Sequence, residues 1–134
     1  MAESKPDLMI LAHGGTWDMR FQISSLAASA AAAGERVEIA LFFAALDAWV
    51  GGRWDALDPS PPLTAERLAA LAMPPLSSLL EAGRTAGLLR LYACSASTRL
   101  LGLDMARTSA AVDAVLGWQT FARMTSAAGR VVSF

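Results

Sequence analysis

The chain contains very few of the residues that most catalytic and metal-binding sites use. Its 134 residues include one cysteine and one histidine. A single cysteine excludes a disulfide within the chain and any Cys-x-x-Cys redox or zinc pair. A single histidine leaves little for a histidine-based metal site, so neither a metal nor a cofactor is expected. Thiol chemistry at Cys94 is therefore the first functional hypothesis.

Charge is also scarce. Charged residues make up 17% of the chain, the formal net charge is -1, and lysine and arginine do not cluster. Capture of nucleic acid needs a basic stripe, so no nucleic-acid partner is expected. Hydrophobic residues make up 54% of the chain, which is high for a small domain. We expect some of this apolar surface to meet another subunit, in a homo-oligomer or with related subunits.

No long hydrophobic run is present. Met1 to Asp7 is polar, and the apolar run that follows, Leu8 to Ala12, is too short for a signal peptide or a membrane span. The sequence therefore predicts a cytoplasmic protein with no membrane partner. Its length fits one domain, residues 1–134.

Buried-type strands alternate with helical patterns along the chain, which predicts an α/β domain. Its sheet is expected to be mainly parallel, with four to five strands and both faces covered. Strands are predicted at Leu8–His13, Arg36–Phe43, Leu88–Ala93 and Arg130–Phe134. Helices are predicted at Phe21–Ala33, from Leu63 to the Pro74-Pro75 pair, from Pro75 to Gly83 or Gly87, at Ser95–Leu101 and at Trp118–Ala128.

Two further segments have less regular patterns. Ala44 to Pro62 is predicted to be a loop with a helical turn, and Leu103 to Ala114 to be partly helical surface. Trp17, Trp49 and Trp54 are expected in loops outside the helix faces that build the core. Because aromatic residues are enriched at interfaces, this placement supports an oligomer.

Cys94 directly follows the strand predicted at Leu88–Ala93 and precedes a segment that can open a helix. In parallel sheets, binding and catalytic sites are often located at such strand-to-helix corners. Unpaired N–H groups of the first turn would favour thiolate over thiol. The residues expected to support the sulfur with N–H groups, hydroxyls or charge are Ser95, Ala96, Ser97, Thr98 and Arg99. The alternative is that Cys94 is a small buried hydrophobe, as lone cysteines usually are.

Neighbouring residues argue against several thiol chemistries. A peroxiredoxin-type peroxidase needs Thr-x-x-Cys, but Leu91 stands at the threonine position. A thiol phosphatase needs an arginine six residues after the cysteine, where Leu100 stands, and Arg99 is one residue short. No local motif supports a protease-type cysteine, histidine and orienting group. The remaining hypothesis is a thiolate that carries a group.

A second candidate site lies at the glycine corner after the first strand. His13, Gly14 and Gly15, with Phe43 at the next strand end, form a candidate pocket at the same edge of the sheet as Cys94. The corner lacks both the Gly-x-Gly-x-x-Gly spacing and the Walker lysine, which argues against phosphate binding. His13 is either a general base or, as is commoner for a lone histidine, a group that hydrogen-bonds backbone.

The cysteine segment also carries a family resemblance. The run Leu91–Ser97, followed by Leu101–Leu103, resembles the cysteine motif of the DsrE/DsrF-like family, which includes sulfur-relay subunits of the DsrEFH and TusBCD type. The segments Ser25–Gly34 and Val37–Phe43 resemble the family's Ala-rich helix and Phe-Phe strand end. Gly117–Phe121 is similar to its late Gly-x-x-x-Phe helix entry.

This resemblance implies a three-layer α/β/α sandwich that forms homo- or hetero-oligomers. It also implies that Cys94 carries sulfur as a persulfide between donor and acceptor proteins, as in a sulfurtransferase or sulfur-relay component. The alternative is a non-catalytic oligomeric binding module of the same fold, with a small-ligand or partner site at the carboxyl edge of the sheet.

Overall fold

The structure is a computed structural model that describes residues 5–59 and 63–134. At its centre is a five-stranded sheet in the order β4-β3-β2-β1-β5, and every pair of neighbours runs parallel. The strands are β1 (Leu8–Ala12), β2 (Val37–Leu41), β3 (Leu89–Cys94), β4 (Ala114–Leu116) and β5 (Arg130–Ser133). The predicted parallel α/β sheet is confirmed.

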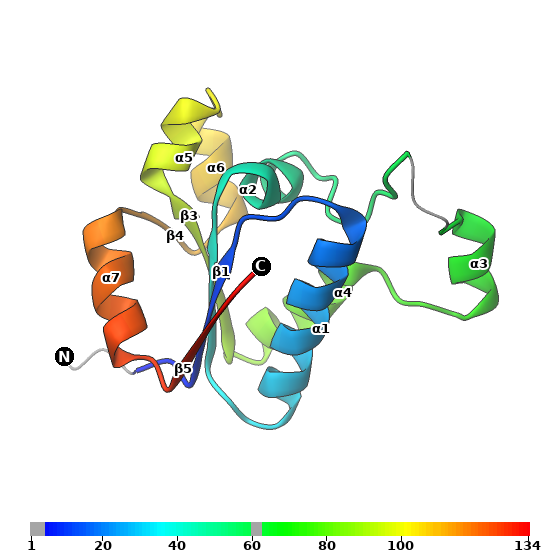
Figure 1. Ribbon diagram of the computed structural model, residues 1–134, viewed down its shortest axis with the longest axis horizontal. Helices are drawn as coiled ribbons and strands as arrows, with labels where there is room; N and C mark the ends of the chain where they lie inside the picture. The colour runs from blue at the N-terminus through cyan, green and yellow to red at the C-terminus, as the bar shows by residue number, and fades with distance from the viewer. Residues whose placement is uncertain (1–4, 60–62) are drawn as a thin grey trace.

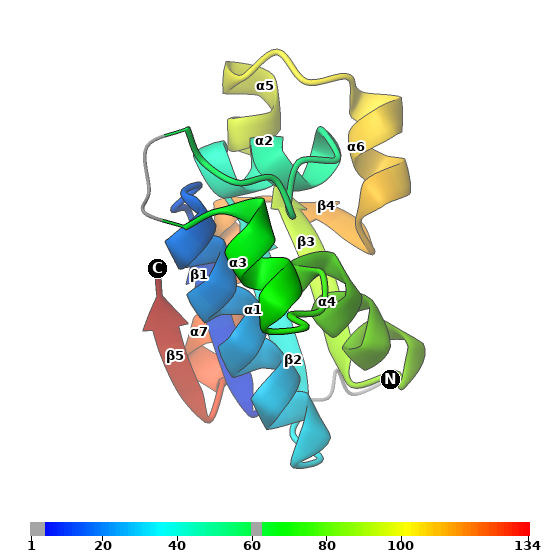
Figure 2. The ribbon, with the colours of Figure 1, turned by 90° about the vertical axis from the view of Figure 1, so that its right-hand side faces the viewer.

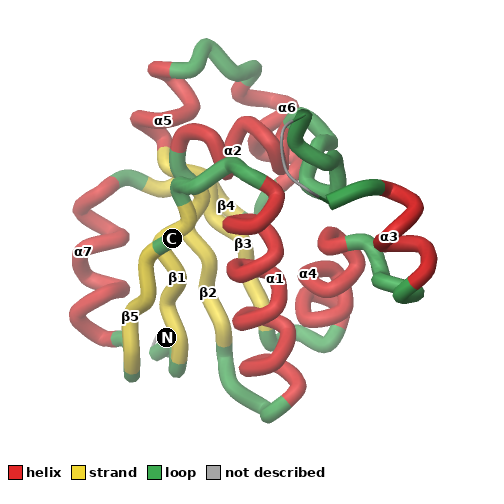
Figure 3. Tube along the Cα trace, turned by 45° about the vertical axis from the view of Figure 1, so that its right-hand side comes forward, coloured by secondary structure: helices red, strands yellow, loops and turns green. Residues whose placement is uncertain are grey.

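Helices cover both faces of this sheet, which gives the three layers expected from the sequence (Figure 1). The helices are α1 (Trp17–Ala32), α2 (Phe43–Val50), α3 (Ala65–Ala70), α4 (Leu76–Thr85), α5 (Ser95–Leu100), α6 (Met105–Ala111) and α7 (Trp118–Ala127). Figure 3 shows α1 and α4 on one side of the sheet and α7 on the other. In Figures 1 and 2, α2, α5 and α6 gather at the carboxyl ends of the strands.

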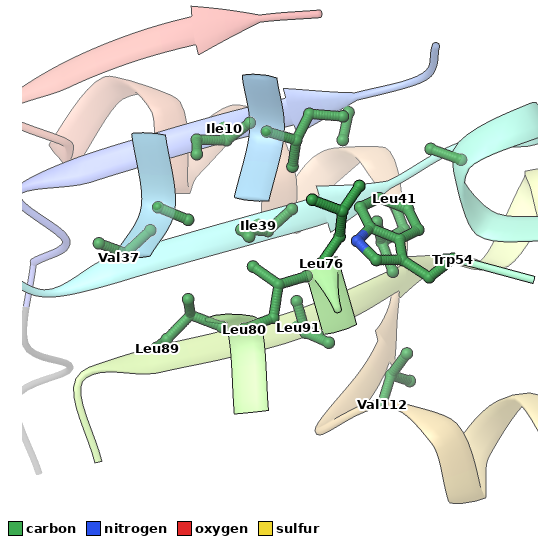
Figure 4. Packing of buried hydrophobic residues seen from close by; sticks show 14 of the residues in the cluster. Ile10, Val37, Ile39, Leu41, Trp54, Leu76, Leu80, Leu89, Leu91 and Val112 are labelled. Carbon is green, nitrogen blue, oxygen red and sulfur yellow. The ribbon is translucent and has the colours of Figure 1, made fainter. Parts of the chain in front are cut away.

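The main core lies between the sheet and the pair α1 and α4. Ile39 of β2, Leu91 of β3 and Leu80 of α4 are fully buried and belong to one apolar cluster (Figure 4). Burying a side chain of this size stabilises the fold by about 1.5–3 kcal/mol. A second, smaller cluster lies on the α7 face, made of Met9, Ala40, Phe42, Tyr92, Cys94 and Phe121. The side chain of Cys94 therefore points to the face that α7 covers.

Three element predictions need correction. Helix α1 begins at Trp17, four residues before the predicted Phe21. The strand predicted through Phe43 ends at Leu41, and helix α2 starts at Phe43 inside the segment predicted as a loop. The last part of that predicted loop, residues 60–62, lies outside the described residues. Strand β4 was not predicted, because its three residues are fewer than a usual strand has.

The tryptophans predicted in loops are part of the subunit's own packing. Trp17 opens α1, Trp49 lies within α2, and Trp54 belongs to the main core with 2% of its surface exposed. The indole N–H of Trp54 donates to Ser24 Oγ at 2.9 Å, and that of Trp49 to the Ala111 carbonyl at 2.8 Å. These rings do not supply the free interface expected of them. Within residues 5–59 and 63–134, no helix is long and apolar enough to cross a membrane.

Candidate functional site

Cys94 occupies the corner where β3 passes into α5, as the sequence predicts. It is the last residue of the strand and the N-cap of the helix. Cys94 is aligned with Leu116 of β4. On the other side, Ala93 is aligned with Leu41, so the next residue, Phe42, lies beside Cys94. The thiol is thus flanked by the carboxyl ends of two neighbouring strands.

The chain leaves β3 and β4 toward opposite faces of the sheet. After β3 it passes through α5 and α6, and the end of α6 packs on the main core through Ala111. After β4 it enters α7, which packs on the second cluster through Phe121. In open parallel sheets, ligand sites form where adjacent strands send their connections to opposite faces. Cys94 lies at such a point.

One backbone N–H group is directed at the sulfur. The amide of Ser97 donates to Cys94 Sγ at 3.4 Å. The hydroxyl of Thr98 donates to the Cys94 carbonyl at 2.8 Å and so holds the corner, without touching the sulfur. The corner therefore fixes one backbone N–H donor beside the sulfur.

The hydroxyl of Ser97 is an unusual feature of this corner. Ser97 is 1% exposed, and among the described residues its Oγ has no hydrogen-bond partner. A buried hydroxyl without a partner is energetically costly, so native structures rarely keep one. Ser97 Oγ is thus a free donor and acceptor in the residue whose amide already binds the sulfur.

The other predicted supporting residues do not converge on the sulfur. Ser95 is half-buried and Ala96 is exposed. Arg99 is exposed in the last turn of α5 and forms no ion pair within the described part of the chain. Within the described segment from Ser95 to Arg99, only Ser97 donates a hydrogen bond to the sulfur.

The site is closed. Cys94 is 1% exposed and packs within the second cluster, beside Phe42 and Phe121. Trp118 stacks on Phe42 with ring centroids 5.0 Å apart and meets Phe121 edge-on at 5.9 Å. Trp118 is itself 53% exposed, so the stack separates the second cluster from solvent. Sequence reasoning missed these aromatic residues, because their meeting depends on the path of α7 over the sheet.

The predicted pocket residues lie elsewhere along the carboxyl edge. The amides of His13 and Gly14 donate to the Phe134 carbonyl at 2.8 and 3.0 Å, and the His13 side chain is exposed. A Cβ on Gly15 would lie 2.5 Å from Ala44 Cβ, so this glycine permits close approach of the corner to α2. Phe43 is exposed at the start of α2. These residues do not form one pocket with Cys94.

A separate cavity of about 420 Å³ opens at the carboxyl ends of β1 and β2. Of the four predicted pocket residues, Gly15 alone lines it. Its lining residues are Gly15, Thr16, Arg20, Ala44, Asp47, Ala48, Arg53, Ala56, Leu57, Asp58 and Pro59.

A buried ion pair forms part of the cavity wall. Arg20 is 3% exposed and donates to the carbonyls of Gly15, Arg53 and Trp54. It also pairs with Asp58 at 3.2 Å, and Asp58 accepts from the Trp17 amide at 2.5 Å. The Asp58 carboxylate thus occupies the N-terminus of α1, the place where a bound phosphate would lie. This pair was not predicted, since its partners are 38 residues apart.

A second polar network lies on the same sheet face as Cys94, one pleat earlier on β3. The Tyr92 hydroxyl donates to Glu38 Oε1 at 3.2 Å, and both residues are buried. Burial, and then the charge of Glu38, raise the pKa of Tyr92 to about 12. Tyr92 therefore stays protonated across the physiological pH range.

In sequence comparisons, no protein-family model and no curated protein matches the chain.

Proposed function

We propose that this protein is a sulfur carrier that holds sulfane sulfur as a persulfide on Cys94. The observation that carries the proposal is the hydrogen bond from the Ser97 amide to Cys94 Sγ, at the point where β3 and β4 send the chain to opposite faces. The resemblance of Leu91–Ser97 to the cysteine motif of DsrE/DsrF-like proteins points to the same chemistry.

The amide and the hydroxyl of Ser97 have separate proposed roles, before and after Cys94 takes up sulfur. The Ser97 amide donates to the sulfur atom that must attack. The Ser97 hydroxyl has no partner within the described residues, and we propose that it bonds to the outer sulfur once the persulfide has formed. On this proposal, the persulfide is the partner that the buried hydroxyl otherwise lacks.

The transfer needs no oxidant or reductant. The Cys94 thiolate attacks the outer sulfur of a donor R–S–SH, the new S–S bond forms, and R–S⁻ leaves with the electron pair of the broken bond. An acceptor thiolate then attacks the outer sulfur of Cys94–S–SH and releases Cys94 as a thiolate. Since the chain has one cysteine, the acceptor is another molecule or another subunit.

Intact-mass spectrometry after incubation with a persulfide donor tests this proposal. Wild-type protein is expected to gain about 32 Da, the mass of one sulfur atom, and to lose it on treatment with a reductant. Cys94→Ser is expected to gain nothing while keeping the fold, because serine also caps a helix. A wild-type protein that stays unmodified with several competent donors would contradict the proposal.

Two serine variants test the role of the corner. Ser97→Ala removes the unpartnered hydroxyl and is expected to slow loading about fivefold, as loss of about one hydrogen bond would. Ser95→Ala, at a half-buried neighbouring position, is the matched control and should leave the loading rate unchanged. Equal rates for the two variants would remove the Ser97 hydroxyl from the mechanism and leave only its amide.

The cavity at β1 and β2 favours a second candidate function, a non-catalytic binding module. Its volume of about 420 Å³ lies within the range of small-molecule sites, and it does not include Cys94. Alkylation of Cys94 by iodoacetamide in the folded protein distinguishes the two functions. A carrier must react under native conditions, whereas a merely packed cysteine reacts only when the whole chain unfolds.

A further inference from the structure

The burial of Cys94 conflicts with any role that brings it into contact with a second molecule. The residue is 1% exposed, yet the proposed function, on which this inference rests, requires a donor and an acceptor to reach the sulfur. Some part of its surroundings must therefore move. The aromatic residues around the second cluster identify that part.

Phe42 and Trp118 close the second cluster on its outer side. Phe42 lies next to Cys94 along the carboxyl edge and is 5% exposed. Trp118 stacks on Phe42 and meets Phe121 edge-on, and within the described residues its indole N–H forms no hydrogen bond. With half of its surface in solvent, Trp118 has little to keep it in place once Phe42 moves.

Phe43, the residue after Phe42, has a strained backbone. Its φ is +42°, in the left-handed region that bulky residues rarely adopt. Its side chain is 48% exposed, so ring burial offsets little of this strain. The N-cap of α2, Phe42, also provides no side-chain capping bond. Strain of this kind persists where the surroundings impose it, and it is common at segments that switch.

We propose that Phe42, Phe43 and Trp118 form a gate over Cys94. In the closed state, Phe42 and Trp118 stack over the second cluster and Phe43 holds its positive φ. In the open state, Phe43 relaxes to a negative φ, which turns Phe42 relative to α2, breaks the stack and exposes the sulfur. The strain at Phe43 keeps the closed state only slightly more stable than the open one.

Two substitutions of the strained residue should separate strain from side-chain size. Phe43→Gly removes the ring and the strain, whereas Phe43→Ala removes the ring and keeps a Cβ at positive φ. Relief of strain favours the closed state, so alkylation of Cys94 should be about tenfold slower in Phe43→Gly than in Phe43→Ala. Phe43→Asn should also be slower than Phe43→Ala, since asparagine tolerates this region.

Removal of the outer ring should have the opposite effect. Trp118→Ala loses both ring contacts, and alkylation should be about tenfold faster than in wild type. Leu101→Ala, an exposed apolar position at the same edge, is the matched control and should alkylate at the wild-type rate. Trp118→Leu gives a milder change in the same direction if the alanine variant folds poorly.

The experiment measures the rate of iodoacetamide alkylation of the full chain in the folded state, over a series of low urea concentrations. Local opening predicts rates that barely depend on urea and that order the variants as stated. Equal rates for Phe43→Gly and Phe43→Ala, or rates that follow the free energy of global unfolding, would overturn the gate. Because alkylation needs no persulfide, failed sulfur loading with this order of rates would discard the carrier function and keep the gate.

Discussion

At the scale of single residues, the candidate site could be predicted only in part. The position of Cys94 at a strand-to-helix corner follows from an apolar run that ends at the one cysteine. The hydrogen bond from the Ser97 amide follows from the helix that begins there. Phe42 and Trp118 come from segments that meet only in the folded chain, so no local pattern indicated them.

Tyr92 allows a direct test of the polar network near this site, because the chain has a single tyrosine. Its pKa of about 12 predicts that ultraviolet absorbance of the native protein will show tyrosinate well above the ordinary midpoint of about 10. Glu38→Gln removes a nearby negative charge and should lower the midpoint, although burial keeps it above the ordinary value. A native midpoint near the ordinary value would contradict the network.

The same shift has a consequence for stability. A pKa raised in the folded state means that Tyr92 stabilises the fold fully below about pH 10. This contribution is then lost as the pH rises from about 10 toward 12. The free energy of unfolding, measured with urea, should therefore fall less steeply between about pH 10 and pH 12 in Tyr92→Phe than in wild type.

At the scale of secondary-structure elements, local patterns predicted the buried strands β1, β2 and β3 well. The residues of these strands are buried on both faces of the sheet. A short continuous apolar run is typical of such a strand in a parallel sheet, so its sequence is easy to interpret. The start of α1 was not predictable, because Asp58 supplies the carboxylate that binds the Trp17 amide from 41 residues away. Gly15 was likewise predicted to belong to a ligand-binding corner. The structure shows that a glycine is needed there because a Cβ would collide with Ala44.

Loss of the buried Arg20 side chain should greatly lower the stability of the fold. Arg20→Met leaves the Asp58 carboxylate and several buried carbonyls without their partner, so the free energy of unfolding should fall by about 3 kcal/mol. Arg53→Met is the control, since its ion pair with Asp47 is exposed and should contribute less than about 1 kcal/mol. Urea denaturation measures both free energies of unfolding. Similar losses for the two variants would contradict a special stabilising role for the buried Arg20–Asp58 pair.

At the scale of the whole molecule, the distribution of exposed apolar side chains is uneven. Of the seven large hydrophobic residues that the described part of the chain exposes, five lie at or near the carboxyl edge of the sheet. These five are Phe43, Leu100, Leu101, Met105 and Trp118. The expectation of an oligomer thus rests on this end of the molecule, and not on the tryptophans that first suggested it.

Light scattering tests the expected oligomer. Wild-type protein at micromolar concentration should have a mass well above 14.1 kDa. Leu100→Glu, at a side chain 73% exposed on this edge, should lower that mass. Leu71→Glu, at a residue that is 67% exposed directly after α3, is the control and should leave the mass unchanged. A wild-type mass near that of one chain would contradict the prediction.

Counting the sulfur atoms that pass through Cys94 tests the carrier function most directly. Protein loaded by a persulfide donor and freed of excess donor is mixed with a thiol acceptor, and the masses of both are followed. A sulfur carrier should gain about one sulfur atom per wild-type chain and transfer the same amount to the acceptor. Loading that survives in Cys94→Ser, or a wild-type chain that gains no sulfur, would contradict it.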